Sequence, residues 1–155
     1  NGSAELLVVY DEESSLEVAY ALVLTKNLYG YVLLKYMAVL PWYRGKGVGI
    51  AAMRLINKRY ADRQGIIAEL TSFEDEDGSM IKGLRKFFAR FGYVVVDSDY
   101  RIGGAPVELM VKPIKGTFEI EPVEHRIIRD FYTRILNPFA MDKMIDIRPV
   151  RKPEE

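Results

Sequence analysis

Residues 36–49 read Tyr36-Met-Ala-Val-Leu-Pro-Trp-Tyr-Arg-Gly-Lys-Gly-Val-Gly49, an apolar run that passes through a proline into a loop of alternating glycines. Glycine lets the backbone approach a ligand closely, and successive N–H groups at the start of a helix form a site for an anion. Arg44 and Lys46 add positive charge to the loop. These properties predict a pyrophosphate site, although the same glycines could instead form a turn that packs the next helix tightly.

The segments around this loop predict one sheet with helices against it. Apolar runs separated by short polar turns indicate strands, and the first of these neighbours form an antiparallel meander. Apolar residues at helical spacing indicate helices, and Pro122 suits the first turn of a further helix in the tail. The expected strands cover residues 6–10, 16–25, 31–39, 66–70, 93–99 and 107–112, and the expected helices cover residues 48–63, 79–91, a tail segment from 122 and a short piece from 138 to about 144. This order predicts a mixed α/β fold.

The length of 155 residues predicts one domain over residues 1–155, with a core over about 6–112 and a C-terminal helical extension over about 118–150. Lys and Arg together number 22, as do Asp and Glu, so the chain lacks the basic excess typical of nucleic-acid binding. It has no cysteine and one histidine, which excludes cysteine-based zinc sites and disfavours histidine clusters. We therefore expect neither a metal nor nucleic acid as a ligand.

No apolar run reaches the roughly 18 residues that a membrane span needs. The sequence also shows no export signal and no cysteine. We therefore expect a cytoplasmic protein without a membrane partner. The aromatic residues of the tail are expected to cap the sheet, with a homodimer surface or closure of a substrate site as alternatives. They are Phe131, Tyr132 and Phe139.

Two known phosphate-loop patterns can be compared with the glycine-rich segment. The P-loop pattern G-x-x-x-x-G-K-[ST] is absent. The Rossmann pattern is present as Gly47-Val-Gly-Ile-Ala-Ala52, and Glu69 follows at about the ~20-residue distance of that motif. A Rossmann turn follows its strand directly, however, whereas residues 40–46 intervene here. A nicotinamide-binding oxidoreductase fragment is therefore the less favoured interpretation.

A third pattern, R/Q-x-x-G-x-G/A, is matched at every position by Arg44-Gly-Lys-Gly47-Val-Gly49. With the preceding Ala38-Val39 and the later segment Phe87-Phe-Ala-Arg-Phe-Gly-Tyr93, the chain resembles the GNAT superfamily of acyl-CoA-dependent N-acyltransferases from residue 6 to about 112. The resemblance implies a mostly antiparallel central sheet with splayed strands, flanked by helices. The strand and two helices that normally precede the family's meander, and that wall its acceptor site, are not recognised in this sequence.

The resemblance also implies that acetyl-CoA is a co-substrate held largely by main-chain groups. Its pyrophosphate would meet the amides of the loop, namely those of Arg44, Gly45, Lys46, Gly47, Val48 and Gly49. Its pantetheine arm would pair with the backbone of Met37, Ala38 and Val39, where one amide would polarise the thioester carbonyl. Phe87 and Arg90, on the second helix, would lie along the other side of the arm.

The implied reaction is N-acetylation, by direct attack of a primary amine on the acetyl thioester. Glu69 is the candidate base, and Tyr36 could instead hold a water in the proton path. Many family members carry a tyrosine that protonates the departing thiolate at the position where this chain has Phe88. Tyr36, Tyr93 or water would have to replace that acid. Phe88 therefore leaves an alternative open, a non-catalytic acyl-CoA-binding or regulatory module on the same fold.

Overall fold

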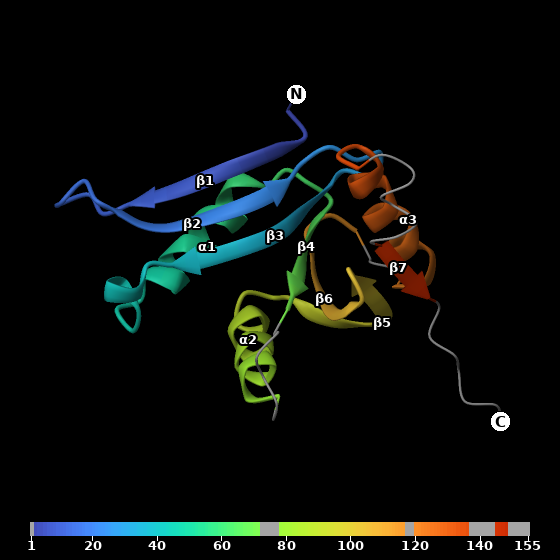
Figure 1. Ribbon diagram of the computed structural model, residues 1–155. Helices are drawn as coiled ribbons and strands as arrows, with labels where there is room; N and C mark the ends of the chain where they lie inside the picture. The colour runs from blue at the N-terminus through green and yellow to red at the C-terminus, as the bar shows by residue number, and fades with distance from the viewer. Residues whose placement is uncertain (1, 72–77, 117–119, 137–144, 149–155) are drawn as a thin grey trace.

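The computed structural model describes residues 2–71, 78–116, 120–136 and 145–148. These residues form one seven-stranded sheet in the order β1-β2-β3-β4-β6-β5-β7, with helices against it (Figure 1). The strands are β1 Ala4–Tyr10, β2 Glu17–Leu24, β3 Tyr31–Val39, β4 Gly65–Leu70, β5 Val94–Ile102, β6 Ala105–Pro113 and β7 Ile145–Arg148. The helices are the short 3-10 turn η1 Pro41–Tyr43, α1 Val48–Arg59, α2 Ser79–Ala89 and α3 Ile120–Thr133.

Strand direction separates the two fold classes that the sequence left open. Within the described residues every neighbouring pair of strands is antiparallel except β3 and β4, which run parallel and are joined through α1. A dinucleotide-binding Rossmann domain needs a mostly parallel, doubly wound sheet. The Rossmann interpretation is therefore wrong, and the mixed, mostly antiparallel sheet with flanking helices is confirmed.

Side chains that alternate along the central strands build two hydrophobic layers, one on each face of the sheet. Val32 and Leu34 of β3 point to the face covered by α1 and α2, where Met53 and Phe88 pack against them. Leu33 points to the opposite face, where it belongs to the layer that includes Ile127, Ile128 and Phe131 of α3. The tail helix therefore caps one side of the sheet, as expected for Phe131 and Tyr132, whereas Phe139 lies outside the described residues.

Two helices end earlier than their sequence patterns predict. Helix α1 ends at Arg59 instead of residue 63, and Tyr60 after it is 3% exposed. Tyr60 leaves helical geometry, with φ of −107° and ψ of +20°, and its hydroxyl donates to Glu5 Oε1 on β1 at 3.3 Å. Helix α2 likewise ends at Ala89, two residues before the expected end.

The second half of the sheet extends further than expected. Strands β5 and β6 meet at Gly103 and Gly104, which have φ angles of +57° and +81°. Two consecutive positive φ angles define the tight hairpin turn that suits the twist of paired strands. The hairpin therefore lengthens both expected strands up to this turn.

The C-terminal extension contains a strand as well as a helix. β7 pairs antiparallel with β5, so that Tyr100 lies opposite Ile147 and Ile102 opposite Ile145. The free edge of β5 offers backbone groups that a short extended segment can satisfy. The extension is thus not wholly helical, and the short helix expected over residues 138–144 lies outside the described residues. Within the described part of the chain, no helix combines the length and hydrophobicity that crossing a membrane requires.

Candidate functional site

A fork opens in the middle of the sheet where β3 and β4 separate. Their paired residues run from Tyr31 opposite Gly65 to Leu34 opposite Ala68, and the pairing stops there. β3 continues to Val39, still paired with β2 on its other side. Alternate backbone N–H and C=O groups of this stretch therefore face the gap instead of a strand. The splayed strands expected from the family resemblance are present.

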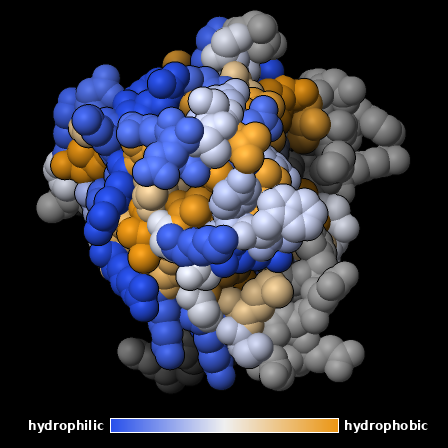
Figure 2. Space-filling model, turned by 90° about the vertical axis from the view of Figure 1, so that its left-hand side faces the viewer, coloured by the Kyte–Doolittle hydropathy of each residue, from blue (hydrophilic) through white to orange (hydrophobic). Residues whose placement is uncertain are grey.

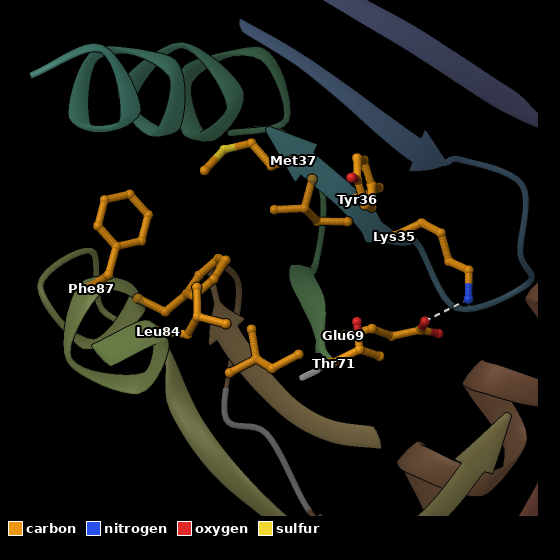
Figure 3. Close-up of a pocket in the computed structure, with 10 residues that line it drawn as sticks. Lys35, Tyr36, Met37, Glu69, Thr71, Leu84 and Phe87 are labelled. Carbon is orange, nitrogen blue, oxygen red and sulfur yellow. Dashed lines mark hydrogen bonds and ion pairs between the residues drawn. The ribbon is translucent and has the colours of Figure 1, made fainter. Parts of the chain in front are cut away.

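A cavity of about 140 Å³ occupies the fork. Figure 3 shows Met37 of β3 on one side of it, facing Leu84 and Phe87 of α2 on the other. Its lining also includes Leu34, Lys35, Tyr36, Glu69, Leu70, Thr71 and Phe88. The walls are mostly apolar, and the free backbone edge of β3 supplies hydrogen-bonding groups. This is the arrangement that an extended, partly apolar arm with amide groups needs.

The glycine-rich loop begins where β3 ends, and it shapes the N-terminus of α1. Gly45 and Gly47 have φ angles of +75° and +77°, a region that favours glycine. The hydrogen bond that begins the helix runs from the Ala51 N–H to the Gly47 carbonyl. The N–H groups of Val48 and Gly49, in the first turn, therefore have no acceptor within the helix. They form the positive end of the helix dipole, which favours an anion.

The loop, β3 and α2 meet at Gly49. A Cβ atom built there would lie 3.7 Å from Cζ of Phe87 and 3.8 Å from Cγ2 of Val39. The Arg44 side chain also joins the loop to β3, because its Nε donates to the Val39 carbonyl at 3.2 Å. Figure 2 views this end of the molecule, where hydrophobic residues gather near the centre and hydrophilic residues along the left side.

Most residues expected to hold acetyl-CoA therefore lie along one path from the fork to α1. The path comprises Met37, Ala38, Val39, Phe87 and the loop from Arg44 to Gly49, a segment that includes Lys46 and Val48. Arg90 is the exposed C-cap of α2, and its expected contact with the arm stays a prediction.

Glu69, the expected base, lies at the branch point of the fork with its side chain only 1% exposed. Its Oε2 accepts a hydrogen bond from Lys35 Nζ at 2.7 Å. Its Oε1 accepts bonds from the hydroxyls of Tyr100 at 3.1 Å and Tyr132 at 2.7 Å. Both oxygens are thus engaged, but these three bonds leave one of the roughly four acceptor sites of a carboxylate unused, on Oε2.

Lys35 and Tyr100 are not among the site residues expected from the sequence, and Tyr132 is expected near the site only through the aromatic tail. Lys35 Nζ also donates to the Tyr132 hydroxyl, and it lies 4.9 Å from the centre of that ring. One feature of the sequence could have pointed to Lys35, because this lysine interrupts an otherwise apolar run. Nothing local connects it to Tyr100 or Tyr132, which come from β5 and α3.

Tyr36, the other candidate catalytic residue, is 55% exposed. Its ring stacks on Tyr20 of β2, with 6.1 Å between the ring centres and 27° between their planes. Tyr36 also lines the cavity, so its hydroxyl is free to meet water at the mouth of the fork. Its role as a water-holding residue stays a prediction.

The position of the missing acid is filled by a buried phenylalanine. Phe88 is 5% exposed and packs edge-on against Phe87 and Tyr93. Tyr93, one possible substitute, directs its hydroxyl to Asn57 Oδ1 at 3.0 Å, on α1. Of the candidates named for this role, Tyr36 is therefore the tyrosine whose hydroxyl meets solvent.

Three buried tyrosines should lose their hydroxyl protons only at unusually high pH. Burial raises the pKa of Tyr93, Tyr100 and Tyr132 above the ordinary value near 10, and the Glu69 carboxylate raises the pKa of the last two further. Their contribution to stability is complete below the pKa of the unfolded chain and is lost as the pH rises from there towards the folded pKa. We expect an alkaline absorbance titration of the ten tyrosines to leave these three un-ionised until the protein unfolds. If all ten ionised together in the folded protein near pH 10, the buried cluster would be contradicted.

The described residues contain no group of three or more His, Cys, Asp or Glu side chains placed to hold a metal ion. The polar side chains at the fork include Tyr36 and Thr71, and a lysine, a glutamate and two tyrosines that satisfy one another. The chemistry that this site can do therefore depends on backbone amides, one ion pair and phenolic hydroxyls.

Comparison with solved structures finds acetyltransferases with the same fold. Nourseothricin acetyltransferase matches with a TM-score of 0.57 and 17% identity over 73% of this chain and 66% of that one. An aminoglycoside 6'-N-acetyltransferase complexed with coenzyme A matches with a TM-score of 0.54 and 16% identity, over 77% of each chain. The ribosomal-protein-S18-alanine N-acetyltransferase from Escherichia coli gives 0.54 and 15%, over 77% of this chain and 74% of that one. This chain thus spans just under two thirds of the first of these proteins.

At these sequence identities the structural matches show only that the fold is the same. No curated protein matches the chain significantly in sequence. The family model for the acetyltransferase (GNAT) domain, however, matches residues 2–95. The matched region includes the meander, the glycine-rich loop, α1, β4 and α2, and therefore both sides of the fork. A sequence match over most of the chain, on the elements that build the site, shows that this chain belongs to the GNAT acetyltransferase family.

Proposed function

We propose that the chain transfers an acetyl group from acetyl-CoA to a primary amine. The observation that carries the proposal is the continuous path from the free edge of β3, through the loop, to the N-terminus of α1. One end of this path suits an extended arm and the other suits a diphosphate. A GNAT neighbour solved with coenzyme A supports the choice of ligand.

At the anionic end, the amides between Arg44 and Gly49 would hold the pyrophosphate. Those in the first turn of α1 have no helical acceptor, and the helix dipole adds to their attraction for an anion. The side chains of Arg44 and Lys46 supply positive charge, and Lys46 Nζ lies 6.0 Å from the ring centre of Tyr43. This charge favours a ligand with more than one negative group.

At the thioester end, the backbone of Met37, Ala38 and Val39 would pair with the arm as a strand would. An N–H in this stretch that faces the gap could polarise the acetyl carbonyl, as an oxyanion site does. Phe87 would close the other side of the arm. The arm would thus lie between a polar edge and an apolar wall, shielded from water.

In the proposed reaction the amine nitrogen bonds to the acetyl carbon as the carbon–sulfur bond breaks. One proton must leave the nitrogen and one must reach the sulfur. Glu69 and a water held by Tyr36 are the candidates for accepting the first. Tyr36 or water would supply the second, and a thiol with a pKa near ~8.5 leaves without a strong acid.

The alternative function is a non-catalytic acyl-CoA-binding or regulatory module. Phe88 favours it, because a buried aromatic ring without a hydroxyl stands where the family often has its acid. Such a module would bind acetyl-CoA as well as an enzyme would, but release no thiol with any amine. A thiol-release assay across a broad panel of amines separates the two functions.

The first test is ligand-induced stabilisation. At a concentration of about 100 times its Kd, a ligand stabilises the folded state by about 2.7 kcal/mol. For a chain of this length that free energy raises the Tm by roughly 5–10 °C. We expect this shift with acetyl-CoA and with CoA, and none with NAD, in a thermal melt followed by circular dichroism.

A shift with NAD instead of CoA would contradict the proposal. So would no shift with either CoA species at millimolar concentration, because the loop would then be a structural turn. A shift with CoA but no thiol release over the amine panel would favour the non-catalytic module.

A further inference from the structure

We propose that half-buried Lys35 and buried Glu69, Tyr100 and Tyr132 form a polar cluster that fixes the opening angle of the fork, and that they serve acetyl transfer as positioning residues. The inference rests on the proposed function. It concerns how the two walls of the site are held apart, and it assigns the C-terminal helix α3 a part in this.

The cluster begins where the backbone stops joining the two strands. The last paired residues of β3 and β4 are Leu34 and Ala68, and the next residue on each strand is Lys35 and Glu69. These two side chains form an ion pair at 2.7 Å (Figure 3). A side-chain bridge thus replaces the main-chain ladder at the first unpaired position of the fork.

Lys35 is also displaced from the strand on its other side. In the pairing of β2 with β3, Leu22 lies opposite Tyr36 and Val23 opposite Leu34, which leaves Lys35 as the extra residue of a β-bulge. A bulge bends its strand and locally increases the twist. The bend in β3 and the ion pair therefore occur at the same residue, which can set the direction of the free part of the strand.

Glu69 can be buried only because the cluster satisfies it. The carboxylate accepts bonds from Lys35 on one oxygen and from Tyr100 and Tyr132 on the other. A buried charge that loses a partner is costly, and fully satisfied polar networks rigidify the structure around them. The three donors come from β3, β5 and α3, so the branch point of the fork is connected to three separate elements.

The tyrosine from α3 makes the tail part of this arrangement. Two residues before Tyr132, Asp130 accepts a hydrogen bond at 2.7 Å from the N–H of Leu28, which lies in the turn before β3. Ile127 and Phe131 bury the same helix against the sheet. Helix α3 is therefore attached both at the start of β3 and at the branch point, and it can hold β3 over the length that precedes the fork.

The consequence concerns the width of the cavity. Beyond Lys35, β3 carries the backbone of Met37, Ala38 and Val39 along one wall, while Leu84 and Phe87 line the other. A change of angle at the branch point moves the far end of the strand more than its start. The cluster should therefore control how well the arm of acetyl-CoA fits, without touching it.

This role makes a prediction that differs from that of a catalytic base at Glu69. Loss of a base would be specific to Glu69 and would act on turnover and its pH dependence. If the cluster positions the strand, substitutions of Lys35 or Tyr132 should have the same effect as one of Glu69, although they remove no base. They should weaken acetyl-CoA binding as well as turnover. The three residues should then behave alike.

The experiment compares K35M, E69Q and Y132F with the wild-type chain. Acetyl-CoA affinity is measured by calorimetry, and kcat and KM with an amine found in the panel. We expect all three variants to bind acetyl-CoA about tenfold more weakly, the size of effect that a lost hydrogen bond to a charged group can have. K35R, which keeps the cation, should restore most of the affinity.

The matched control is R59M, which breaks the ion pair of Arg59 with Glu5 between α1 and β1, away from the fork. We expect it to bind acetyl-CoA like the wild type. Y132F removes a single hydroxyl from a ring that stays buried, so it carries the test even if E69Q does not fold.

The outcomes separate the two proposals. If the wild type binds no acetyl-CoA, the proposed function fails, and the positioning role fails with it. If the wild type binds it, and K35M and Y132F keep wild-type affinity and kcat/KM, the positioning role alone is overturned. If E69Q then loses turnover together with the acid limb of the pH profile, Glu69 is the base.

Discussion

Replacing Phe131 with alanine is expected to lower the free energy of unfolding by about 3–5 kcal/mol. The ring is 1% exposed and lies in the hydrophobic layer between α3 and the sheet. Its loss removes a large apolar area and leaves a cavity that the neighbouring side chains can fill only partly. Urea denaturation followed by far-ultraviolet circular dichroism measures the change as a lower midpoint with an unchanged slope.

The control for this prediction is I135A, in the turn that follows α3. Ile135 is 44% exposed, so its truncation should change stability by no more than about 0.5 kcal/mol. The F131A protein should also unfold in a single transition by every probe, because α3 packs on the same sheet as the rest of the chain. Two separate transitions would contradict the expectation of one domain over residues 1–155, and an unchanged midpoint would contradict the packing of α3.

The second large effect is expected at the glycine that begins α1. Gly47 has a φ of +77°, where a β-branched residue is strained, although a Cβ there would meet no other atom within 4 Å. G47V should therefore weaken acetyl-CoA binding by about 10- to 100-fold, through a loop that can no longer direct its amides to one point. Calorimetry with acetyl-CoA measures the effect.

Gly78 supplies a closely matched control. It caps α2 with a φ of +73°, and a Cβ there also meets open space. G78V should thus carry a similar backbone strain, on the order of 1–3 kcal/mol. We expect G78V to bind acetyl-CoA like the wild type. If G47V lost stability but also kept wild-type affinity, the loop would have no part in binding.

The sequence predicts best those elements whose limits are set by local chemistry. The bounds expected for β3 agree with the structure, because Pro41 follows closely and cannot continue the strand. The start of α1 at Val48 agrees as well, since the preceding glycine is needed for a positive φ. The end of α1 does not, because the burial of Tyr60 against β1 depends on a contact between distant segments.

The same distinction applies to the site. The glycine-rich loop and the β3 backbone are contiguous in sequence, so one motif could place them together. The polar cluster at the fork joins Lys35, Glu69, Tyr100 and Tyr132, and no spacing pattern relates residues so far apart. Strand β7 was missed although Ile145 and Ile147 alternate with polar residues, because four residues are too few for a period to be recognised.

The hydrogen bond from Arg44 to the Val39 carbonyl has a consequence for ligand length. The Tyr43 N–H also donates to the Leu40 carbonyl at 2.9 Å, so the connection between β3 and α1 is held by its own bonds. These bonds restrain the separation of the strand edge and the helix N-terminus, so we expect little freedom to be lost when a ligand binds. If the chain binds acetyl-CoA as proposed, it should select a thioester whose distance from the diphosphate matches that separation.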